Sequence, residues 1–121
     1  MIKLEGVRFR YPNGPEAIKG VTLSVEDCEF VGVIGHSGAG KTTLAKLIAG
    51  LLKPSEGRVL VDGMDTRVTP ASALARKVGY VFQNPETMLF SATLLDEVAF
   101  ALRNFGYPPG EIESRVRAAL E

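Results

Sequence analysis

The sequence predicts an α/β fold, and three observations lead to this prediction. Residues 30–34 are apolar in succession, and a glycine-rich loop and a segment with helical apolar spacing follow them directly. Two earlier segments, residues 2–11 and 21–25, alternate polar and apolar side chains, which is typical of half-buried antiparallel strands. Helical spacing returns over residues 93–121, so strands and helices are both expected.

The composition is that of one globular domain. The chain has 121 residues, 45% of them hydrophobic, with a formal net charge of +0. This neutral balance gives no sign of a nucleic-acid partner, and none is expected. Cys28 is the only cysteine, which excludes an internal disulfide and favours a reducing compartment. No apolar run approaches the ~20 residues of a membrane span, and no signal peptide is recognisable, so we expect a cytoplasmic protein.

The glycine-rich loop fits the pattern G-x-x-x-x-G-K-[ST], the phosphate-binding P-loop. Wrapping a polyphosphate brings several backbone N–H groups close to its oxygens, and glycine allows both the approach and the turns with positive φ. A strand before the loop and a helix after it form the context that the motif requires. A glycine-rich turn without a ligand is the alternative. The loop comprises Gly35, His36, Ser37, Gly38, Ala39, Gly40, Lys41 and Thr42.

Two side chains at the end of the loop indicate its chemistry. Lys41 is a mobile cation that can reach the β- and γ-phosphates, and Thr42 offers a hydroxyl to Mg²⁺. If a helix begins at Lys41, its free N–H groups and its positive dipole end also face the phosphates. His36 is expected to be a loop residue rather than a catalytic one.

The remaining elements are expected in the following order. Residues 2–11 form a strand with a bulge or turn at Gly6, and the helix after the loop ends near residues 53–54. Residues 58–61 form a short strand closed by a turn at Asp62-Gly63. Thr69 caps a brief helix that opens with Pro70, and residues 78–82 form another strand.

Two helices are predicted after residue 92. Thr93 is expected to cap the first of them, with Asp96 completing a capping box. The second begins near Glu111 and carries Ile112, Val116 and Leu120 at helical spacing. Because no stop signal follows Leu120, we expect the chain to be cut within this helix, with a fraying terminus as the alternative.

Three landmarks in order now resemble the ATP-binding cassette (ABC) ATPases, the motor subunits of ABC transporters. Tyr11 lies where the family has the A-loop aromatic residue, residues 35–42 match its Walker A motif, and Thr43 follows. Gln83, before Asn84-Pro85, matches the Q-loop glutamine. The sequences at residues 80–85, 89–91 and 96–100 are similar to those of the energy-coupling-factor ATPases, which drive import of cobalt, nickel and vitamins.

This resemblance implies a P-loop NTPase fold of the ABC ATPase type, represented by its N-terminal half. Residues 1–30 and 57–64 correspond mainly to an antiparallel β-subdomain. Residues 30–56 and 70–85 correspond to part of the RecA-like nucleotide-binding core. Residues 86–121 correspond to the Q-loop and the start of the helical subdomain. The family's signature motif, Walker B aspartate, catalytic glutamate and switch histidine are not found in this sequence.

The resemblance also implies ATP and Mg²⁺ as cofactors, with defined roles for individual residues. Tyr11 would stack on adenine and Thr43 would meet the α-phosphate. Lys41 and Gln83 are the expected catalytic residues, and Thr42 and Gln83 the expected Mg²⁺ ligands. Tyr11 as a rim aromatic and Gln83 as a polar strand end are the alternatives. Cys28 departs from the family, which often has glycine in a turn there.

A membrane subunit and a second ATPase subunit are the expected partners. By resemblance, residues 86–91 lie in a groove that accepts the transmembrane subunit, and Met88, Leu89 and Phe90 would be exposed there unless they pack under the helical subdomain. The protein would act on the inner face of the cell membrane, as a homodimer or heterodimer, importing a metal ion (cobalt or nickel) or a vitamin. A soluble ABC-type ATPase of repair or translation and an inactive half-domain remnant are the alternatives. Because the motifs are incomplete, we expect the 121-residue chain to bind nucleotide weakly, without efficient turnover.

Overall fold

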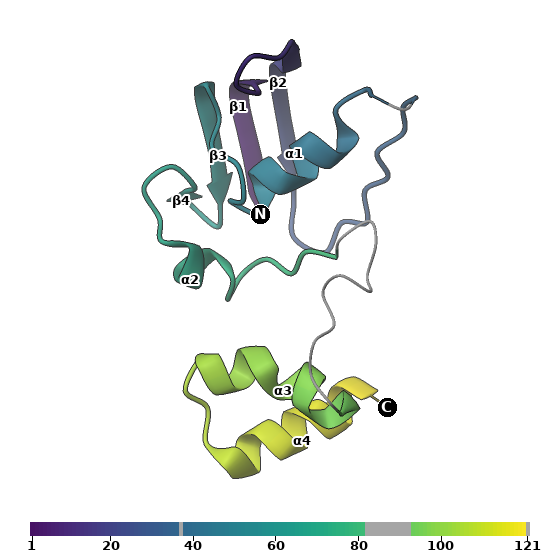
Figure 1. Ribbon diagram of the computed structural model, residues 1–121, viewed down its shortest axis with the longest axis vertical. Coiled ribbons are helices and arrows are strands. Elements are labelled where there is room, and N and C mark those ends of the chain that lie inside the picture. The colour runs from purple at the N-terminus through teal and green to yellow at the C-terminus, as the bar shows by residue number, and fades with distance from the viewer. Residues whose placement is uncertain (37, 82–92, 121) are drawn as a thin grey trace. The chain divides into compact units, whose positions relative to one another are not determined.

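The computed structural model describes residues 1–36, 38–81 and 93–120, and the elements named below belong to these ranges. The chain divides into two compact units, Met1–Tyr80 and Val81–Glu121, called here the sheet unit and the helical unit. The sheet unit holds the β-strands and two helices, and the helical unit holds two further helices, as Figure 1 shows. Ser37, residues 82–92 and Glu121 lie outside the described residues.

The sheet unit is built on a four-stranded antiparallel sheet of order β2-β1-β3-β4 (Figure 1). The strands are β1 (Ile2–Arg10), β2 (Glu16–Val25), β3 (Glu56–Val61) and β4 (Met64–Asp65). Their positions confirm the antiparallel sheet expected from the alternating polarity, although β2 begins five residues earlier than the alternation indicated. The Asp62-Gly63 turn between β3 and β4 has positive φ at both residues, 49° and 80°, as a tight hairpin turn requires.

Gly6 interrupts β1 as predicted. Its φ is +56°, and the pairing register shifts between Leu4 and Val7, so that both of these side chains point into the core. On the neighbouring strand, Gly57 approaches this bulge closely. A Cβ atom on Gly57 would overlap the carbonyl oxygens of Glu5 and Gly6. The two glycines therefore allow β1 and β3 to pair across an irregular register.

One helix covers the apolar face of the sheet. Helix α1 (Lys41–Ile48) packs on β2 and β3 and begins at the residue that the loop motif predicted. Figure 1 shows it lying across the sheet. The core between helix and sheet is formed by buried apolar side chains from both: Leu4, Val7, Phe9, Ile18, Leu47 and Val59.

Helix α1 is shorter than predicted. It ends at Ile48, and Gly50 follows at φ +78°. The Gly50 N–H donates to the Leu47 carbonyl (3.2 Å) and the Leu51 N–H to the Lys46 carbonyl (2.9 Å), which is a Schellman C-cap. A side chain on Gly50 would also overlap Leu74, so this stop is fixed by conformation and packing together. The prediction of an end near residues 53–54 relied on Pro54 and overlooked the glycine.

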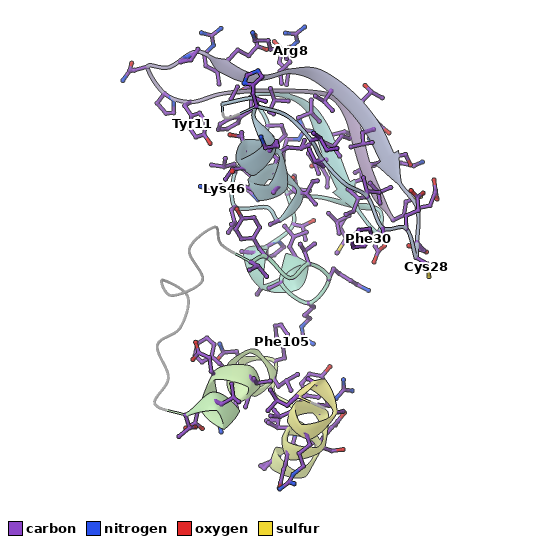
Figure 2. The ribbon with its side chains drawn as sticks, turned by 90° about the vertical axis from the view of Figure 1, so that its right-hand side faces the viewer. Arg8, Tyr11, Cys28, Phe30, Lys46 and Phe105 are labelled. Atoms are coloured by element: carbon purple, nitrogen blue, oxygen red, sulfur yellow. The ribbon has the colours of Figure 1, made fainter. Side chains whose placement is uncertain are left out.

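Two predicted strands are not formed, and this corrects the expectation. Residues 29–36 and 78–81 have no strand conformation, and Phe82 lies outside the described residues. Phe30 and Ile34 are 102% and 98% exposed rather than buried. A strand needs a hydrogen-bonding neighbour, and neither segment has one among the described residues. In the view of Figure 2, Phe30 lies at the edge of the sheet unit, near Cys28.

The short helix after the hairpin also differs in detail from the prediction. Helix α2 (Ala71–Leu74) is capped by Pro70, which has extended φ and ψ, rather than by Thr69. The Thr69 hydroxyl instead donates to the Asp65 carbonyl at 2.7 Å. Leu74 is buried and anchors this helix.

The helical unit consists of α3 (Leu94–Asn104) and α4 (Pro109–Leu120), which pack on each other. Thr93 caps α3 as predicted, because its hydroxyl accepts from the Asp96 N–H at 3.1 Å. The predicted capping box is not completed, however, because the described residues show no hydrogen bond from the Thr93 N–H to the Asp96 carboxylate. This carboxylate accepts from the Thr93 hydroxyl at 2.9 Å and from Arg103 at 2.9 Å. Among the described residues of this unit, Ala99, Ile112 and Val116 form a buried core, with Val98, Leu102 and Tyr107 packed beside them.

Candidate functional site

The loop before α1 has the backbone features of an anion-binding turn. Gly38 and Gly40 lie at φ +86° and +94°, and Gly40 is the N-cap of α1. No side chain of the described residues caps this helix, and its first turn has no acidic residue. The first N–H groups of an α-helix have no intrahelical partner, so those of α1 are available to an anion. A polyphosphate therefore fits this end of the helix.

Lys41 lies at the start of α1 with its ammonium group turned back over the loop. It donates to the carbonyl oxygens of Gly35 and His36, the second at 2.9 Å. Gly35 has little room for a side chain, because a Cβ atom there would lie 3.0 Å from Cβ of Ala39. The loop thus folds compactly around its own cation, which places a positive charge beside the free N–H groups.

The two threonines that follow differ in environment. Thr42 is exposed, whereas Thr43 is only 6% exposed. The Thr43 hydroxyl lies 2.8 Å from the Tyr11 hydroxyl. This hydrogen bond brings the predicted A-loop residue to the predicted phosphate loop, across 32 positions of sequence. Sequence reasoning named both residues and missed the bond, because periodicity carries no information about such a distant contact.

The packing of the loop on the sheet is close. A Cβ atom on Gly40 would lie 2.8 Å from the Ala17 carbonyl oxygen and 3.0 Å from Cδ1 of Ile18. β2 therefore presses directly on the last glycine of the loop. Figure 2 shows Tyr11 beside α1, at the opposite end of the sheet unit from Cys28 and Phe30.

The remaining predicted site residues belong to the undescribed parts of the chain. Ser37 and Gln83 lie outside the described residues, as does the expected partner groove at residues 86–91. Within the described ranges, no cluster of three or more His, Cys, Asp or Glu side chains could hold a metal ion. The helices seen in these same ranges are all too short or too polar to cross a membrane.

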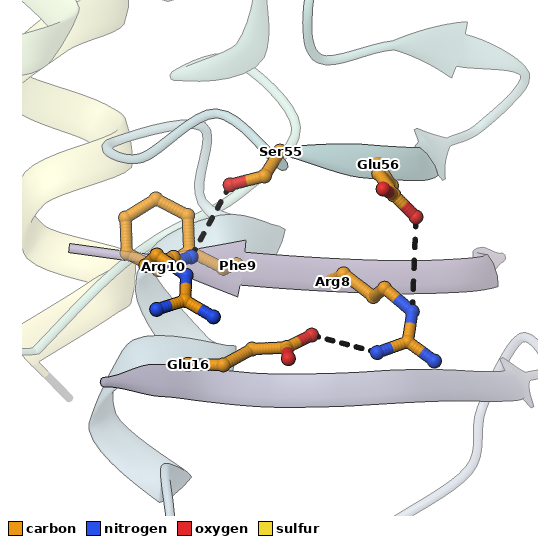
Figure 3. Close-up of a pocket in the computed structure, with 6 residues that line it drawn as sticks. All are labelled: Arg8, Phe9, Arg10, Glu16, Ser55 and Glu56. Atoms are coloured by element: carbon orange, nitrogen blue, oxygen red, sulfur yellow. Dashed lines mark hydrogen bonds and ion pairs between the residues drawn. The ribbon is translucent and has the colours of Figure 1, made fainter. Parts of the chain in front are cut away.

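The sheet unit also has a pocket on its sheet, which differs from the loop in its chemistry. This pocket of about 320 Å³ is lined by residues of β1, β2 and the start of β3 (Figure 3). Arg8 pairs across the strands with Glu16 at 2.8 Å and Glu56 at 3.7 Å, and the hydrogen bond to Glu16 raises the pKa of Arg8. The Ser55 hydroxyl accepts from the Arg10 N–H at 3.2 Å. Because these charges already satisfy one another, we interpret the pocket as a cross-strand ion cluster rather than as a ligand site.

A family model described as "ABC transporter" matches residues 18–121, which include the loop, α1 and the helical unit. The chain belongs to the ABC transporter family. The match confirms the predicted resemblance to this family; Tyr11 lies before the matched residues, and Gln83 lies outside the described ones.

Several relatives are named as ABC transporter or energy-coupling factor transporter ATP-binding proteins. The chain is 47% identical to a putative ABC transporter ATP-binding protein of Pyrococcus furiosus over 121 residues, covering 100% of this chain and 46% of that protein. It is 44% identical to the energy-coupling factor transporter ATP-binding protein EcfA of Methanothermobacter thermautotrophicus over 123 residues, covering 100% of this chain and 40% of the relative. The chain thus spans about half or less of the length of these relatives.

Solved structures of this family resemble the chain in fold. CbiO1 of Clostridium perfringens, described as part of the ABC transporter complex CbiONQ, superposes with a TM-score of 0.85 at 36% identity, covering 98% of this chain and 48% of CbiO1. The ATP-binding cassette MJ0796, in a dimeric post-hydrolysis state with ADP and Pi, superposes with a TM-score of 0.81 at 33% identity. That match covers 99% of this chain and 56% of the cassette.

Proposed function

We propose that the chain forms the nucleotide-binding part of an ABC transporter ATP-binding subunit, which couples hydrolysis of MgATP to transport. The observation that carries the proposal is the free amino end of α1, preceded by Gly38 and Gly40 at positive φ and accompanied by Lys41. Relatives named as ABC transporter ATP-binding proteins support it.

The start of α1 and individual side chains in and around the loop have defined parts in this proposal. The N–H groups at the start of α1 bind phosphate oxygens, and Lys41 leaves the carbonyls of Gly35 and His36 to pair with the β- and γ-phosphates. Thr42 holds Mg²⁺, which when bound supplies charge neutralisation on these phosphates. Thr43 meets the α-phosphate, and the exposed face of the Tyr11 ring accepts adenine. Gln83 completes the Mg²⁺ site in this proposal.

The test is MgATP binding by the protein as its gene encodes it, with Lys41→Ala as the variant. Because a hydrogen bond to a charged group contributes about 1.5–3 kcal/mol, we expect affinity to fall about 10- to 100-fold. Lys46→Ala is the matched control, since it removes a lysine from the last turn of the same helix. Equal losses in both variants would mean that net charge, and not the loop, binds ATP. Absence of binding by the unmodified protein would overturn the proposal.

The transport role of the protein is a second part of the proposal. We propose a membrane subunit bound through residues 86–91, a second ATPase subunit, and a place on the cytoplasmic face of the membrane. Similarity to EcfA and CbiO1, and the dimeric state of the MJ0796 cassette, support these partners. The energy-coupling-factor resemblance favours import of a metal ion or a vitamin. Affinity purification from detergent-solubilised membranes is the test, and recovery without any transmembrane subunit would instead favour a soluble ABC-type ATPase.

A further inference from the structure

The contact between Tyr11 and Thr43 is a defined link between two segments of the site. Their hydroxyl oxygens lie 2.8 Å apart, and either can be the donor. Both the ring and the backbone of Tyr11 are restrained. Phe9 meets the ring edge-on with ring centroids 4.8 Å apart, and the Tyr11 backbone carbonyl accepts from the Gly14 N–H at 3.0 Å. The hydroxyl is thereby fixed over the first turn of α1.

Phosphate binding decides which of the two hydroxyls, Tyr11 or Thr43, is the donor of their hydrogen bond. A hydroxyl group has one hydrogen to donate, and the oxygens of a fully ionised phosphate only accept. If Thr43 donates to a phosphate, its oxygen is left to accept from Tyr11. The hydrogen bonds then run from Tyr11 through Thr43 to the phosphate, and each one strengthens the next by polarisation.

The surrounding packing leaves Thr43 little freedom to find a different arrangement. Thr43 is 6% exposed, and β2 presses on Gly40, three residues earlier, with the Ala17 carbonyl oxygen 2.8 Å from a Cβ position. The start of α1 is therefore fixed against the sheet. Without the Tyr11 hydroxyl, the nearly buried Thr43 oxygen would lose the side-chain partner that it has among the described residues.

We propose that the Tyr11 hydroxyl is a positioning group for the nucleotide phosphates, acting through Thr43, in addition to any role of its ring with the base. This inference rests on the proposed nucleotide-binding function and deepens it. The ring and the hydroxyl of Tyr11 then serve different parts of the same ligand. Removing the hydroxyl alone affects phosphate binding, and removing the ring affects both.

The test compares MgADP and adenosine binding to the protein as its gene encodes it and to Tyr11→Phe, Thr43→Val and the double variant. Since one hydrogen bond contributes about 0.5–1.5 kcal/mol, we expect Tyr11→Phe to weaken MgADP binding about 2- to 10-fold. Adenosine binding, followed by ligand-observed NMR, stays unchanged because the ring is kept. The double variant binds MgADP no more weakly than the weaker single variant, because both changes break one chain of bonds.

Two further variants keep the result interpretable. Tyr107→Phe removes a tyrosine hydroxyl from the helical unit, where the ring lies under Arg115, and leaves MgADP affinity unchanged. Thr43→Ser keeps the hydroxyl, so it retains affinity and retains the sensitivity to Tyr11→Phe even if Thr43→Val folds poorly.

The outcomes separate the inference from the function on which it rests. If the unmodified protein does not bind MgADP, the proposed function fails. If it binds, but Tyr11→Phe weakens MgADP and adenosine equally, or the effects of Tyr11→Phe and Thr43→Val add, the positioning role is overturned while the function stands.

Discussion

At the scale of single residues, Cys28 has a backbone conformation that usually belongs to glycine. Its φ is +63°, in an exposed turn after β2, where the resemblance to the family implies that a glycine is common. A side chain with a Cβ atom is strained in the left-handed region. Cys28 therefore has a strained backbone, and its exposed side chain makes no contribution to the core.

Cys28→Gly is expected to stabilise the protein. The left-handed conformation costs a non-glycine residue about 1–2 kcal/mol, partly offset by the ~0.5–1 kcal/mol entropy loss of glycine. The free energy of unfolding should thus rise by about 0.5–1 kcal/mol in urea denaturation. Cys28→Ser is the control, because it removes the thiol but keeps the strain. An equal gain from Cys28→Ser would show that the thiol, and not the backbone, was responsible.

The residue types of the candidate site could be predicted from the sequence, but the contacts between them could not. The glycines of the loop and Lys41 were predicted from spacing alone, because a phosphate loop constrains residue types at fixed intervals. The bond between Tyr11 and Thr43 could not be predicted, since it depends on how β1 and α1 pack. The turn of the Lys41 ammonium toward Gly35 and His36 is likewise a property of the folded loop.

At the scale of elements, the carboxylate of Asp96 links the two ends of α3. It accepts from Thr93 before the helix and from Arg103 in its last turn. The hydrogen bond from Arg103, followed by that from Thr93, lowers the pKa of Asp96 below its ordinary value of 3.8. The pKa of this carboxylate therefore reports whether α3 is formed.

The lowered pKa of Asp96 predicts how the stability of α3 depends on pH. A depressed pKa in the folded state means that the contribution is fully present above pH 3.8 and is lost as the pH falls through the folded value. An NMR titration of the Asp96 carboxyl should report a pKa below 3.8, returning toward it in Arg103→Gln. Arg115→Gln, whose partner is Glu111, is the matched control. A titration unaffected by Arg103→Gln would contradict the assignment.

The elements were predicted well where a local signal decides them. Alternating polarity predicted β1 and the core of β2, and the Thr93 cap fixed the start of α3. Residues 30–34 were predicted incorrectly, because an apolar run indicates a buried strand only when a neighbour is available to pair with it. The end of α1 was missed because the prediction relied on Pro54 and overlooked the C-cap glycine, Gly50.

At the scale of the whole molecule, the two units differ in the size of their cores. Among the described residues, the sheet unit has a cluster of six buried apolar side chains between α1 and the sheet, and the helical unit has a cluster of three. In the sheet unit, β1 has hydrogen-bonded strands on both sides. Buried apolar area is the main source of local stability, so protection should differ between the units.

Hydrogen exchange followed by mass spectrometry should show this difference in the 121-residue chain. The slowest amides are expected in β1, which lies between β2 and β3, and faster exchange is expected throughout α3 and α4. Peptides covering Val7 and Val116, both fully buried, give a matched comparison of the two cores. Equal protection of these peptides would contradict the ranking.

The contact between Gly57 and the bulge at Gly6 has a consequence for recombination among relatives. The bulge on β1 can pack against β3 only because Gly57 has no side chain, although about fifty residues separate Gly6 and Gly57 along the chain. A chimera that takes β1 from one relative and β3 from another can therefore form this sheet only if both parents share the pair. A crossover between Gly6 and Gly57 therefore preserves the sheet when both parents have this pair of glycines. It disrupts the sheet when one parent lacks the pair, whatever the overall sequence identity of the parents.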